Sequence, residues 1–577
     1  MIKKTKTRPE FFELSNFRRR FTILVLLTLF LTLFFKTLYL QSIQRDFLQA
    51  KGSNYSNREQ ILHAFRGKIL DRNGELLAAS SPVERIEVNL SKLIINKDQK
   101  KRLSLLLEIN KTQLNSRLSK KGKNTVYLKR SVPPEIAKKI MALKIPGIYT
   151  FKEYKRYYPG KEALAHVVGF TNIDGEGQEG IELYSNKLLS GIHGTRKVLK
   201  NRSGKIVDDL QEIQIPIDGK DIKLSVDKRL QYSSYKALEK AVEKHGALSG
   251  SSILIDAKTG EVLAMTNYPS FNPNNRKGLS RDQEYVRNRV VTDMYEPGST
   301  IKPITVSAAL KNNTVKPEDL INTFEGFYKV GKRFTVRDTK SYGLITVKEV
   351  IQKSSNIGTT QISQKLKPKY LWSVLNEYGL GKKTGIEFPG EAKGKIHHHK
   401  NWGESEQATI SYGYGLSSSL IQLVQAYTVF ANQGEIKPIT IFKTNEPVIG
   451  RKVIDKRTSN QMLNILESVI TSEGTGILAK IPGYRVAGKT GTAKKSSNGA
   501  YGNKYRGSFV GIAPVSNPKF ILAVMIDEPT IDGYYGGVVA GPAFQSIMSD
   551  ALKLYSIPKD GIKIAPSSDQ KMVLLNN

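Results

Sequence analysis

The chain has 577 residues, which is too long for one ordinary domain, so two or more domains are expected. It contains no cysteine, which excludes disulfides, thiol nucleophiles and cysteine-bound metals. Its formal net charge of +37 favours partners that carry negative charge, such as nucleic acid, an anionic lipid surface or an acidic cell-wall substrate.

The N-terminal segment predicts a membrane anchor. Phe21–Phe35 is apolar apart from its threonines, and Thr37–Leu40 extends it to about the length that spans a bilayer. Arg18-Arg19-Arg20 directly before it argues against a buried helix and favours a cytoplasmic N-terminus. No A-x-A-like cleavage site follows closely, so we expect a retained signal anchor rather than a removed signal peptide.

The predicted membrane topology indicates which of these negatively charged partners the positive charge favours. We expect a cytoplasmic tail over residues 1–20, a single transmembrane helix over 21–40 in the inner (cytoplasmic) membrane, and the remainder in the periplasm. Because the anchor exports nearly all of the charge, a lipid surface or cell-wall material is a more natural partner than nucleic acid.

Residues 41–221 predict an elongated α+β module. Gln41–Ala64 is polar with scattered apolar positions and suggests a continued helix. Strand alternation around an Asn-Gly turn predicts a hairpin within Arg66–Ala78. Further on, the patterns predict helices between Leu93 and Leu118, a strand over Thr125–Leu128, a helix over Pro133–Leu143, and a mixed, turn-rich stretch up to Asp218.

Residues 222–557 predict a second α+β domain, followed by a loose tail over 558–577. It begins with a strand over Ile222–Val226, a helix over Arg229–Glu243 and a hairpin over 252–265. Long helices are then expected through about Tyr378. Strands return at Ser508–Ala513 and Phe520–Met525, so both ends of this domain are expected to complete one sheet.

Three short strings within this domain suggest acyl transfer. They are Ser299-Thr300-Ile301-Lys302, Ser354-Ser355-Asn356 and Lys489-Thr490-Gly491-Thr492. Each pattern is common in so lysine-rich a chain. Rival matches begin at Ser225, Ser233, Ser516, Ser556 and Ser568 for Ser-x-x-Lys, at Lys258 and Lys383 for Lys-Thr-Gly, and at Ser270 and Ser496 for Ser-x-Asn.

Sequence context separates one set from its rivals. Glu296-Pro297-Gly298 predicts a turn that places Ser299 at the start of a helix, with Lys302 one turn later on the same face. Lys489 ends the strand-like run Tyr484–Gly488. By contrast, the rival at Lys258 joins two strand-like runs and predicts a hairpin turn, and the rival at Lys383 leads into a loop.

The chemistry assigns a role to each member of this set. Free lysine has a pKa of about 10.4, so Lys302 must be buried or face another cation, such as Lys489, to act as the base for Ser299. Ser354 is expected to pass the proton to the leaving amine, and Asn356 to hold the substrate amide. Thr490 and Thr492 suit a terminal carboxylate, Gly491 leaves room for a substrate backbone, and the N–H groups of Ser299 and Thr492 are expected to hold the oxyanion.

Metal and cofactor sites are not expected. His397-His398-His399 could ligate a metal, but adjacent side chains point apart and no carboxylate is spaced to help, so a solvated loop is favoured. His166 and His193 stand alone and are expected to be structural. No Ser-His-Asp set with a nucleophile elbow occurs.

Further strings, in order, resemble those of class B penicillin-binding proteins of the septal type. The resemblance runs from the anchor to about Leu554. It rests on Arg66–Ala78, Gly169–Asn172, Glu179–Glu182, Asp256–Met265, Tyr268–Asn274, Glu296–Pro303, Gln352–Asn356, Gly413–Leu416, Lys489–Lys495 and Tyr534–Pro542.

The resemblance implies an anchor, a non-catalytic pedestal or dimerisation domain over 41–221, and a transpeptidase domain over 222–557. That last domain is expected to have a five-stranded antiparallel sheet flanked by helices, plus an all-helical subdomain. Ser299 would be acylated by D-Ala-D-Ala stem peptides of peptidoglycan and by β-lactams, with Lys302 as its base. No cofactor is implied. Since no glycosyltransferase domain precedes the pedestal, a separate membrane glycosyltransferase and other division proteins are the implied partners.

Alternatives remain open at this level. A D,D-carboxypeptidase or β-lactamase would pass the acyl group to water, although no Glu-based deacylation motif is obvious. A division scaffold could keep the site as a secondary activity. An elongation-type transpeptidase is also compatible with the motifs, whereas the short pedestal and the string Tyr534–Pro542 favour the septal type.

Overall fold

The computed structural model describes residues 15–120, 122, 124–200, 206–276, 284–444, 446, 448–497 and 500–561. Its contacts divide the chain into two units, one of 1–64 with 192–217 and one of 65–191 with 218–577. Most of the predicted tail over 558–577 and the first part of the N-terminal tail lie outside the described residues.

The first unit contains the predicted anchor. Helix α1 (Asn16–Ser42) includes the whole predicted span and is long and apolar enough to cross a membrane. The helical continuation expected over Gln41–Ala64 is only partly right, because α2 (Arg45–Ser56) is followed by strand β1 (Asn57–Leu62). β1 pairs antiparallel with β8 (Gly194–Lys200), a partner far along the chain, and β9 (Ile206–Gln214) completes this sheet.

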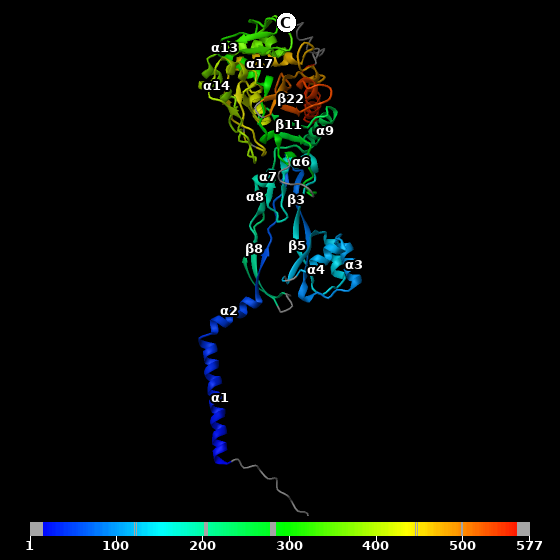
Figure 1. Cartoon of the computed structure of the whole chain (residues 1–577), viewed down its shortest axis with the longest axis vertical. Coiled ribbons are helices and arrows are strands. Elements are labelled where there is room, and N and C mark those ends of the chain that lie inside the picture. Colours follow the sequence, from blue (N-terminus) through cyan, green and yellow to red (C-terminus); the bar gives the residue numbers. More distant parts are fainter. Residues whose placement is uncertain are drawn as a thin grey trace, which may run out of the picture. The chain divides into compact units, whose positions relative to one another are not determined.

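The N-terminal part of the second unit contains residues 65–191 and 218–221 of the α+β module predicted over 41–221, while the rest of that module belongs to the first unit (Figure 1). The predicted hairpin is confirmed: β2 (Ile69–Leu70) and β3 (Leu76–Asn89) are antiparallel, and Gly74 adopts φ +91° in the turn between them. β3 also pairs with β4 (Thr125–Val132) and β5 (Ile148–Tyr157), and β10 (Ile222–Lys223) pairs with β2. The other elements here are α3 (Lys97–Leu106), α4 (Lys111–Leu118), α5 (Pro134–Ala142), α6 (Lys161–Val168), β6 (Phe170–Thr171), β7 (Gly177–Glu179), α7 (Gly180–Tyr184) and α8 (Asn186–Ser190).

A buried ion pair network stabilises this module. The carboxylate of Glu182 is fully buried and contacts the guanidinium of Arg66 at 2.6 Å and that of Arg156 at 2.6 Å. Arg66 also donates to the side chains of Asn186 and Ser190. The network therefore ties the entry to β2, the end of β5 and helices α7 and α8 to one another.

The C-terminal part of the second unit is built on the predicted five-stranded antiparallel sheet. Its order is β12-β11-β23-β22-β21, so strands from both ends of the domain complete it, as expected. The strands are β11 (Ser249–Asp256), β12 (Val262–Tyr268), β21 (Ala487–Ser497), β22 (Ala500–Ala513) and β23 (Phe520–Asp527). Every residue of β11 and β23 is buried, which shows that both faces of the sheet are covered.

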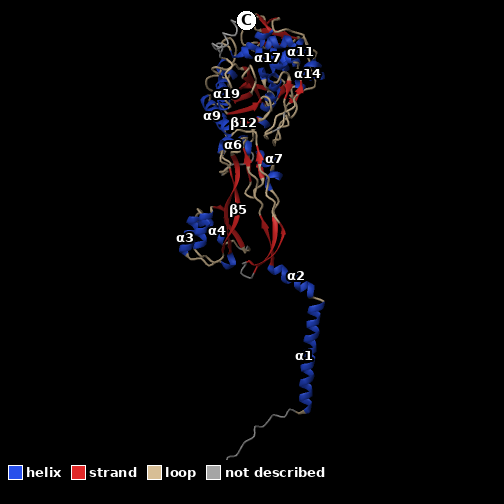
Figure 2. Ribbon diagram, turned by 180° about the vertical axis from the view of Figure 1, so that it is seen from behind, coloured by secondary structure: helices blue, strands red, loops and turns tan. Residues whose placement is uncertain are grey.

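Helices cover the sheet, and other helices form a second layer farther from it. α9 (Lys228–Lys244) and α19 (Gly541–Leu554) pack against each other and against the sheet, while α14 (Pro368–Glu377) lies on the opposite side of the domain (Figures 1 and 2). The other helices are α10 (Arg289–Thr292), α11 (Lys302–Lys311), α12 (Val347–Gln352), α13 (Asn356–Gln364), α15 (Glu404–Ser411), α16 (Leu420–Ala431), α17 (Lys456–Glu467) and α18 (Gly536–Val539).

The expectation of long helices through Tyr378 is wrong. α11 and α14 have ten residues each, and short two-stranded ladders separate α11 from α12. These ladders pair β13 (Leu320–Asn322) with β16 (Leu344–Thr346), and β14 (Phe327–Val330) with β15 (Phe334–Arg337). Further ladders pair β17 (Lys395–Ile396) with β18 (Leu416–Ser417), and β19 (Glu435–Ile436) with β20 (Arg451–Lys452).

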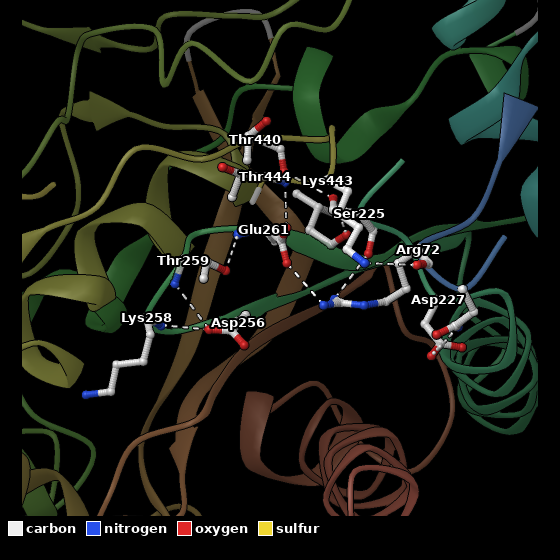
Figure 3. A network of polar contacts seen from close by, with 12 residues as sticks. Arg72, Ser225, Asp227, Asp256, Lys258, Thr259, Glu261, Thr440, Lys443 and Thr444 are labelled. Atoms are coloured by element: carbon white, nitrogen blue, oxygen red, sulfur yellow. Dashed lines mark hydrogen bonds and ion pairs between the residues drawn. The ribbon is translucent and has the colours of Figure 1, made fainter. Parts of the chain in front are cut away.

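The Asn-Gly hairpin turn joins the two parts of the second unit (Figure 3). The Arg72 guanidinium contacts the Glu261 carboxylate at 3.1 Å, and the Arg72 N–H donates to the Val226 carbonyl at 3.0 Å. Glu261 accepts a further bond from the Thr444 N–H at 2.8 Å. The turn is thereby anchored to the start of edge strand β12 and to the segment after β19.

The buried network predicts a large loss of stability on neutralising Glu182. Glu182→Gln should cost about 3–5 kcal/mol, because it leaves the guanidinium groups of Arg66 and Arg156 buried without their shared counter-charge. The measurement is the free energy of unfolding from chemical denaturation followed by circular dichroism.

Glu75→Gln is the matched control. Glu75 is mostly exposed and lies 3.8 Å from Lys228, so its loss should change stability by less than about 1 kcal/mol. Equal small effects of the two substitutions would contradict the proposed importance of the network.

Candidate active site

Ser299 lies in a tight turn that leads directly into a helix. Residues Gly298–Ile301 form a 3-10 helix, and α11 begins at Lys302, which places the serine and the lysine one turn apart as predicted. Gly298 adopts φ +56°, and its N–H donates to the Gly413 carbonyl at 3.0 Å. Ser299 is half-buried, and within the described residues its hydroxyl has no hydrogen-bond partner, which leaves it available to a substrate.

The three sequence strings meet at Ser354. The Lys302 ammonium donates to the Ser354 hydroxyl at 3.2 Å and to the Ser354 carbonyl at 2.5 Å. The Lys489 ammonium donates to the same hydroxyl at 2.9 Å. Ser354 adopts φ +61°, a left-handed conformation that a serine rarely takes, so the surrounding structure holds it in place.

Burial changes the protonation of both lysines. Neither side chain is exposed to solvent. Burial lowers the pKa of Lys302 to about 7, although the negative charge of Asp338 partly opposes this shift. Burial, together with repulsion from Lys302, lowers the pKa of Lys489 well below its usual value. The environment therefore favours the loss of a proton from this pair near neutral pH, which would place a neutral amine beside Ser354.

Asp338 organises the Ser354-Ser355-Asn356 string, and no motif in the sequence pointed to it. It follows β15, and one of its oxygens accepts from the backbone N–H groups of Asn356 at 2.5 Å and Ile357 at 3.2 Å. Its other oxygen accepts from the Ser355 hydroxyl at 2.5 Å. A carboxylate here satisfies N–H groups that a helix start leaves free, so it fixes the N-terminus of α13.

The Asn356 side chain is oriented by the neighbouring backbone. Its amide nitrogen donates to the Arg337 carbonyl at 2.9 Å. This leaves the side-chain oxygen of Asn356, rather than its nitrogen, to accept from a substrate N–H.

Strand β21 forms the other side of the site. It begins at Ala487, so Lys489 lies near the start of the strand rather than at the end of one. The hydroxyl of Thr490 shares a hydrogen bond with that of Thr475 at 2.7 Å. The Thr492 hydroxyl accepts from the Gly536 N–H at 3.0 Å, so its own proton stays available for donation.

Gly491 allows a close approach within the protein itself. A Cβ at this position would lie 2.4 Å from the Ser508 hydroxyl and 2.9 Å from the Thr300 methyl group. A glycine is therefore required where β21 passes the nucleophile turn. Thr475 was not expected from the sequence, since it belongs to no recognised string, whereas Gly536 lies within the string Tyr534–Pro542, to which no role at the site was assigned.

The rival strings lie elsewhere. Lys258-Thr259-Gly260 forms the turn between β11 and β12, as predicted, and Lys383-Thr384-Gly385 lies outside any helix or strand. In the histidine loop, the rings of His398 and His399 lie against Trp372, with centroids 4.8 and 5.5 Å away. The described residues contain no group of three or more His, Cys, Asp or Glu side chains placed to hold a metal ion.

Comparison with known families agrees with this geometry. Residues 250–549 match the penicillin binding protein transpeptidase domain, and residues 61–224 match the penicillin-binding protein dimerisation domain. The transpeptidase match contains Ser299, Lys302, Ser354, Asn356 and Lys489.

Curated relatives match most of the length of the chain. It is 41% identical over 548 residues to the probable peptidoglycan D,D-transpeptidase PenA of Neisseria meningitidis, covering 94% of each chain. It is 39% identical over 531 residues to the peptidoglycan D,D-transpeptidase FtsI of Escherichia coli strain K12, covering 91% of this chain and 89% of the relative.

Solved structures show the same relationship. The apo transpeptidase domain of Burkholderia pseudomallei penicillin-binding protein 3 is 45% identical with a TM-score of 0.54, covering 58% of this chain and 97% of its own. Penicillin-binding protein 3 of Mycobacterium tuberculosis in complex with aztreonam is 26% identical with a TM-score of 0.68, covering 87% of this chain and 98% of its own. With its dimerisation and transpeptidase domains, the chain belongs to the class B penicillin-binding proteins, and it is a peptidoglycan D,D-transpeptidase.

Proposed function

We propose that Ser299 is the nucleophile with which this enzyme cross-links peptidoglycan stem peptides at the division septum. The observation that carries the proposal is the convergence of the buried amines of Lys302 and Lys489 on the Ser354 hydroxyl, with Lys302 one helical turn after Ser299. Paired lysines of lowered pKa are what a serine nucleophile needs at neutral pH, since no histidine takes part.

The first half of the reaction forms an acyl-enzyme. Lys302 removes the proton of the Ser299 hydroxyl while its oxygen attacks the carbonyl carbon of the D-Ala–D-Ala bond. The N–H groups of Ser299 and Thr492 hold the resulting oxyanion, which is worth about 3–4 kcal/mol per donor. The C–N bond then breaks, and Ser354 delivers a proton to the departing D-alanine.

The second half transfers the acyl group. An amine of another stem peptide attacks the ester carbonyl, the Ser299 oxygen leaves with a proton returned through Lys302, and a new amide bond links the two peptides. A β-lactam enters the same path when Ser299 opens its ring, and it stays attached because no amine displaces it.

Three groups are proposed to hold the donor peptide. The side-chain oxygen of Asn356 accepts from the peptide N–H. The hydroxyls of Thr490 and Thr492, together with the charge shared by the lysines, receive the terminal carboxylate. Gly491 keeps β21 close to the nucleophile turn, so that both sides of the site reach one substrate.

The septal role, topology, domain limits and partners belong to the same proposal. Similarity to the relative named FtsI supports the division septum, and α1 with the arginines before it supports an anchor with a cytoplasmic N-terminus. The family matches support a pedestal over 41–221 and a catalytic domain over 222–557. Glycan strands would come from a separate membrane glycosyltransferase that acts with other division proteins.

Replacing the nucleophile should abolish acylation. Ser299→Ala should not be labelled by fluorescent penicillin, because it removes the hydroxyl that attacks the carbonyl, and Ser354, which contacts both lysines, is proposed to transfer a proton rather than to be acylated. Ser233→Ala, which alters a rival Ser-x-x-Lys string in α9, is the control and should label like the wild type. Labelling of Ser299→Ala would refute the assignment.

Whether an amine or water accepts the acyl group distinguishes a transpeptidase from a hydrolase. With a thioester analogue of the donor peptide and a D-amino acid as acceptor, the wild-type enzyme should form the amide product at the expense of the hydrolysed acid. The measurement is chromatography of the products with and without the amine. Hydrolysed acid as the sole product in both reactions would favour a carboxypeptidase.

The pH dependence of acylation should report on Lys302. Because its neutral form is the base, the acylation rate constant should rise with pH through a midpoint near the pKa of about 7. Asp338→Asn removes a charge that raises this pKa, so the midpoint should move to lower pH.

The control is Asp455→Asn, which alters another helix-capping aspartate, at the start of α17. Its midpoint should match that of the wild type, as measured by stopped-flow acylation with a chromogenic cephalosporin. An unchanged or higher midpoint in Asp338→Asn would contradict the prediction that the charge of Asp338 raises the pKa of the base.

A further inference from the structure

A buried tyrosine contacts the backbone directly after the nucleophile. Tyr427 lies in the middle of α16, a helix whose every residue is buried. Its hydroxyl donates to the carbonyl oxygen of Thr300 at 2.9 Å, although the two residues are 127 positions apart in the sequence. This hydroxyl lies outside the strings that define the active site, and the proposed reaction does not use it.

The 3-10 register of the turn supplies no donor to the Thr300 carbonyl. In the 3-10 helix Gly298–Ile301, each carbonyl accepts from the N–H three residues later, and the Lys302 N–H donates in this way to Ser299. The next donor in this register would be residue 303, which is proline and has no N–H. Thr300 is fully buried, so water cannot replace the missing donor.

Two further hydrogen bonds hold the beginning of the turn. The Gly298 N–H donates to the Gly413 carbonyl at 3.0 Å, and the Thr300 hydroxyl donates to the Pro297 carbonyl at 2.8 Å. Tyr427 acts at the end of the turn, where the backbone changes from the 3-10 helix to α11. Ser299 thus lies between two tethers, one at Gly298 and one at Thr300.

We infer that Tyr427 is a positioning residue for the nucleophile: its hydroxyl replaces the N–H that Pro303 lacks and so fixes Ser299 relative to Lys302 and Ser354. It touches neither substrate nor reacting atoms and acts through the Thr300 carbonyl. The inference rests on the proposed role of Ser299. It explains how the turn can have Pro303 directly after Lys302 and still hold Ser299 rigidly.

The chain offers a matched control in Tyr378. This tyrosine is also fully buried, and its ring lies against Phe430, as does that of Tyr427, with centroids 5.7 and 5.5 Å away. Its hydroxyl shares a hydrogen bond with that of Ser307 at 2.7 Å, further along α11. Tyr378→Phe therefore deletes a buried hydroxyl from the same core without touching the nucleophile turn.

The experiment compares acylation by a chromogenic cephalosporin in the full-length wild type, Tyr427→Phe and Tyr378→Phe. Stopped-flow data separate the dissociation constant of the initial complex from the acylation rate constant, and thermal unfolding reports stability. Tyr427→Phe should lower the rate constant about 5- to 50-fold with little change in the dissociation constant, because the nucleophile is misplaced rather than the binding site. Tyr378→Phe should keep the rate constant within about twofold of wild type while losing similar stability.

A second variant tests the cause. Pro303→Ala restores an N–H in the register that reaches the Thr300 carbonyl, so Tyr427→Phe should lower the rate constant much less in this background than in the wild type. Equal losses in both backgrounds, equal losses in the two Phe variants, or a Tyr427→Phe chain that fails to fold when Tyr378→Phe folds would each overturn the inference. If the wild type itself were not acylated on Ser299, the proposed function would fail instead, and peptide mapping of the labelled protein distinguishes that outcome.

Discussion

The proposed active site depends on two lysine side chains buried against one serine hydroxyl. An ammonium group removed from water is costly, and two of them beside each other also repel, so the pair of Lys302 and Lys489 favours loss of a proton at neutral pH. This gives the enzyme a neutral amine without a histidine. The arrangement works only if the rest of the fold holds both chains in place against their mutual repulsion.

The residues of the site come from different helices and strands, and the ends of these elements meet at one place. Lys302 begins α11, Ser354 precedes α13, and Lys489 lies near the start of β21. Asp338 fixes the start of α13, and Gly536 fixes the hydroxyl of Thr492. The sheet and the helical layer therefore meet where the chemistry takes place, and small groups at their ends set the geometry.

Local patterns in the sequence predicted much of this architecture. The hairpin around Asn73-Gly74, the turn at Lys258-Thr259-Gly260 and the return of strands near Ser508 and Phe520 are all confirmed, since each depends on turn chemistry or alternation over a few residues. The order and flanks of the three strings were also enough to select Ser299, Lys302 and Lys489 from several rivals, and the structure brings their strings together.

Features that depend on distant partners could not be predicted in this way. Local patterns predict helix where β1 lies, because its partner β8 is far along the chain, and the short ladders between α11 and α12 interrupt a stretch for which the sequence predicts long helices. Asp338 and Tyr427 carry no motif, because their importance comes from a backbone N–H and a backbone carbonyl that the fold brings to them. Pro303 is the one local feature of the sequence that indicates a missing backbone donor in this turn, because proline has no N–H.

The central claim is that the buried lysine pair supplies a neutral amine at physiological pH. Lysine labelled with 13C at Cε allows each buried side chain to be titrated by NMR, with Lys302→Ala and Lys489→Ala identifying their signals. The account predicts that in the wild type at least one of the two titrates near pH 7 or below, and that the charge of one depends on the other. Titration of both lysines near their ordinary value of about 10.4 would contradict it.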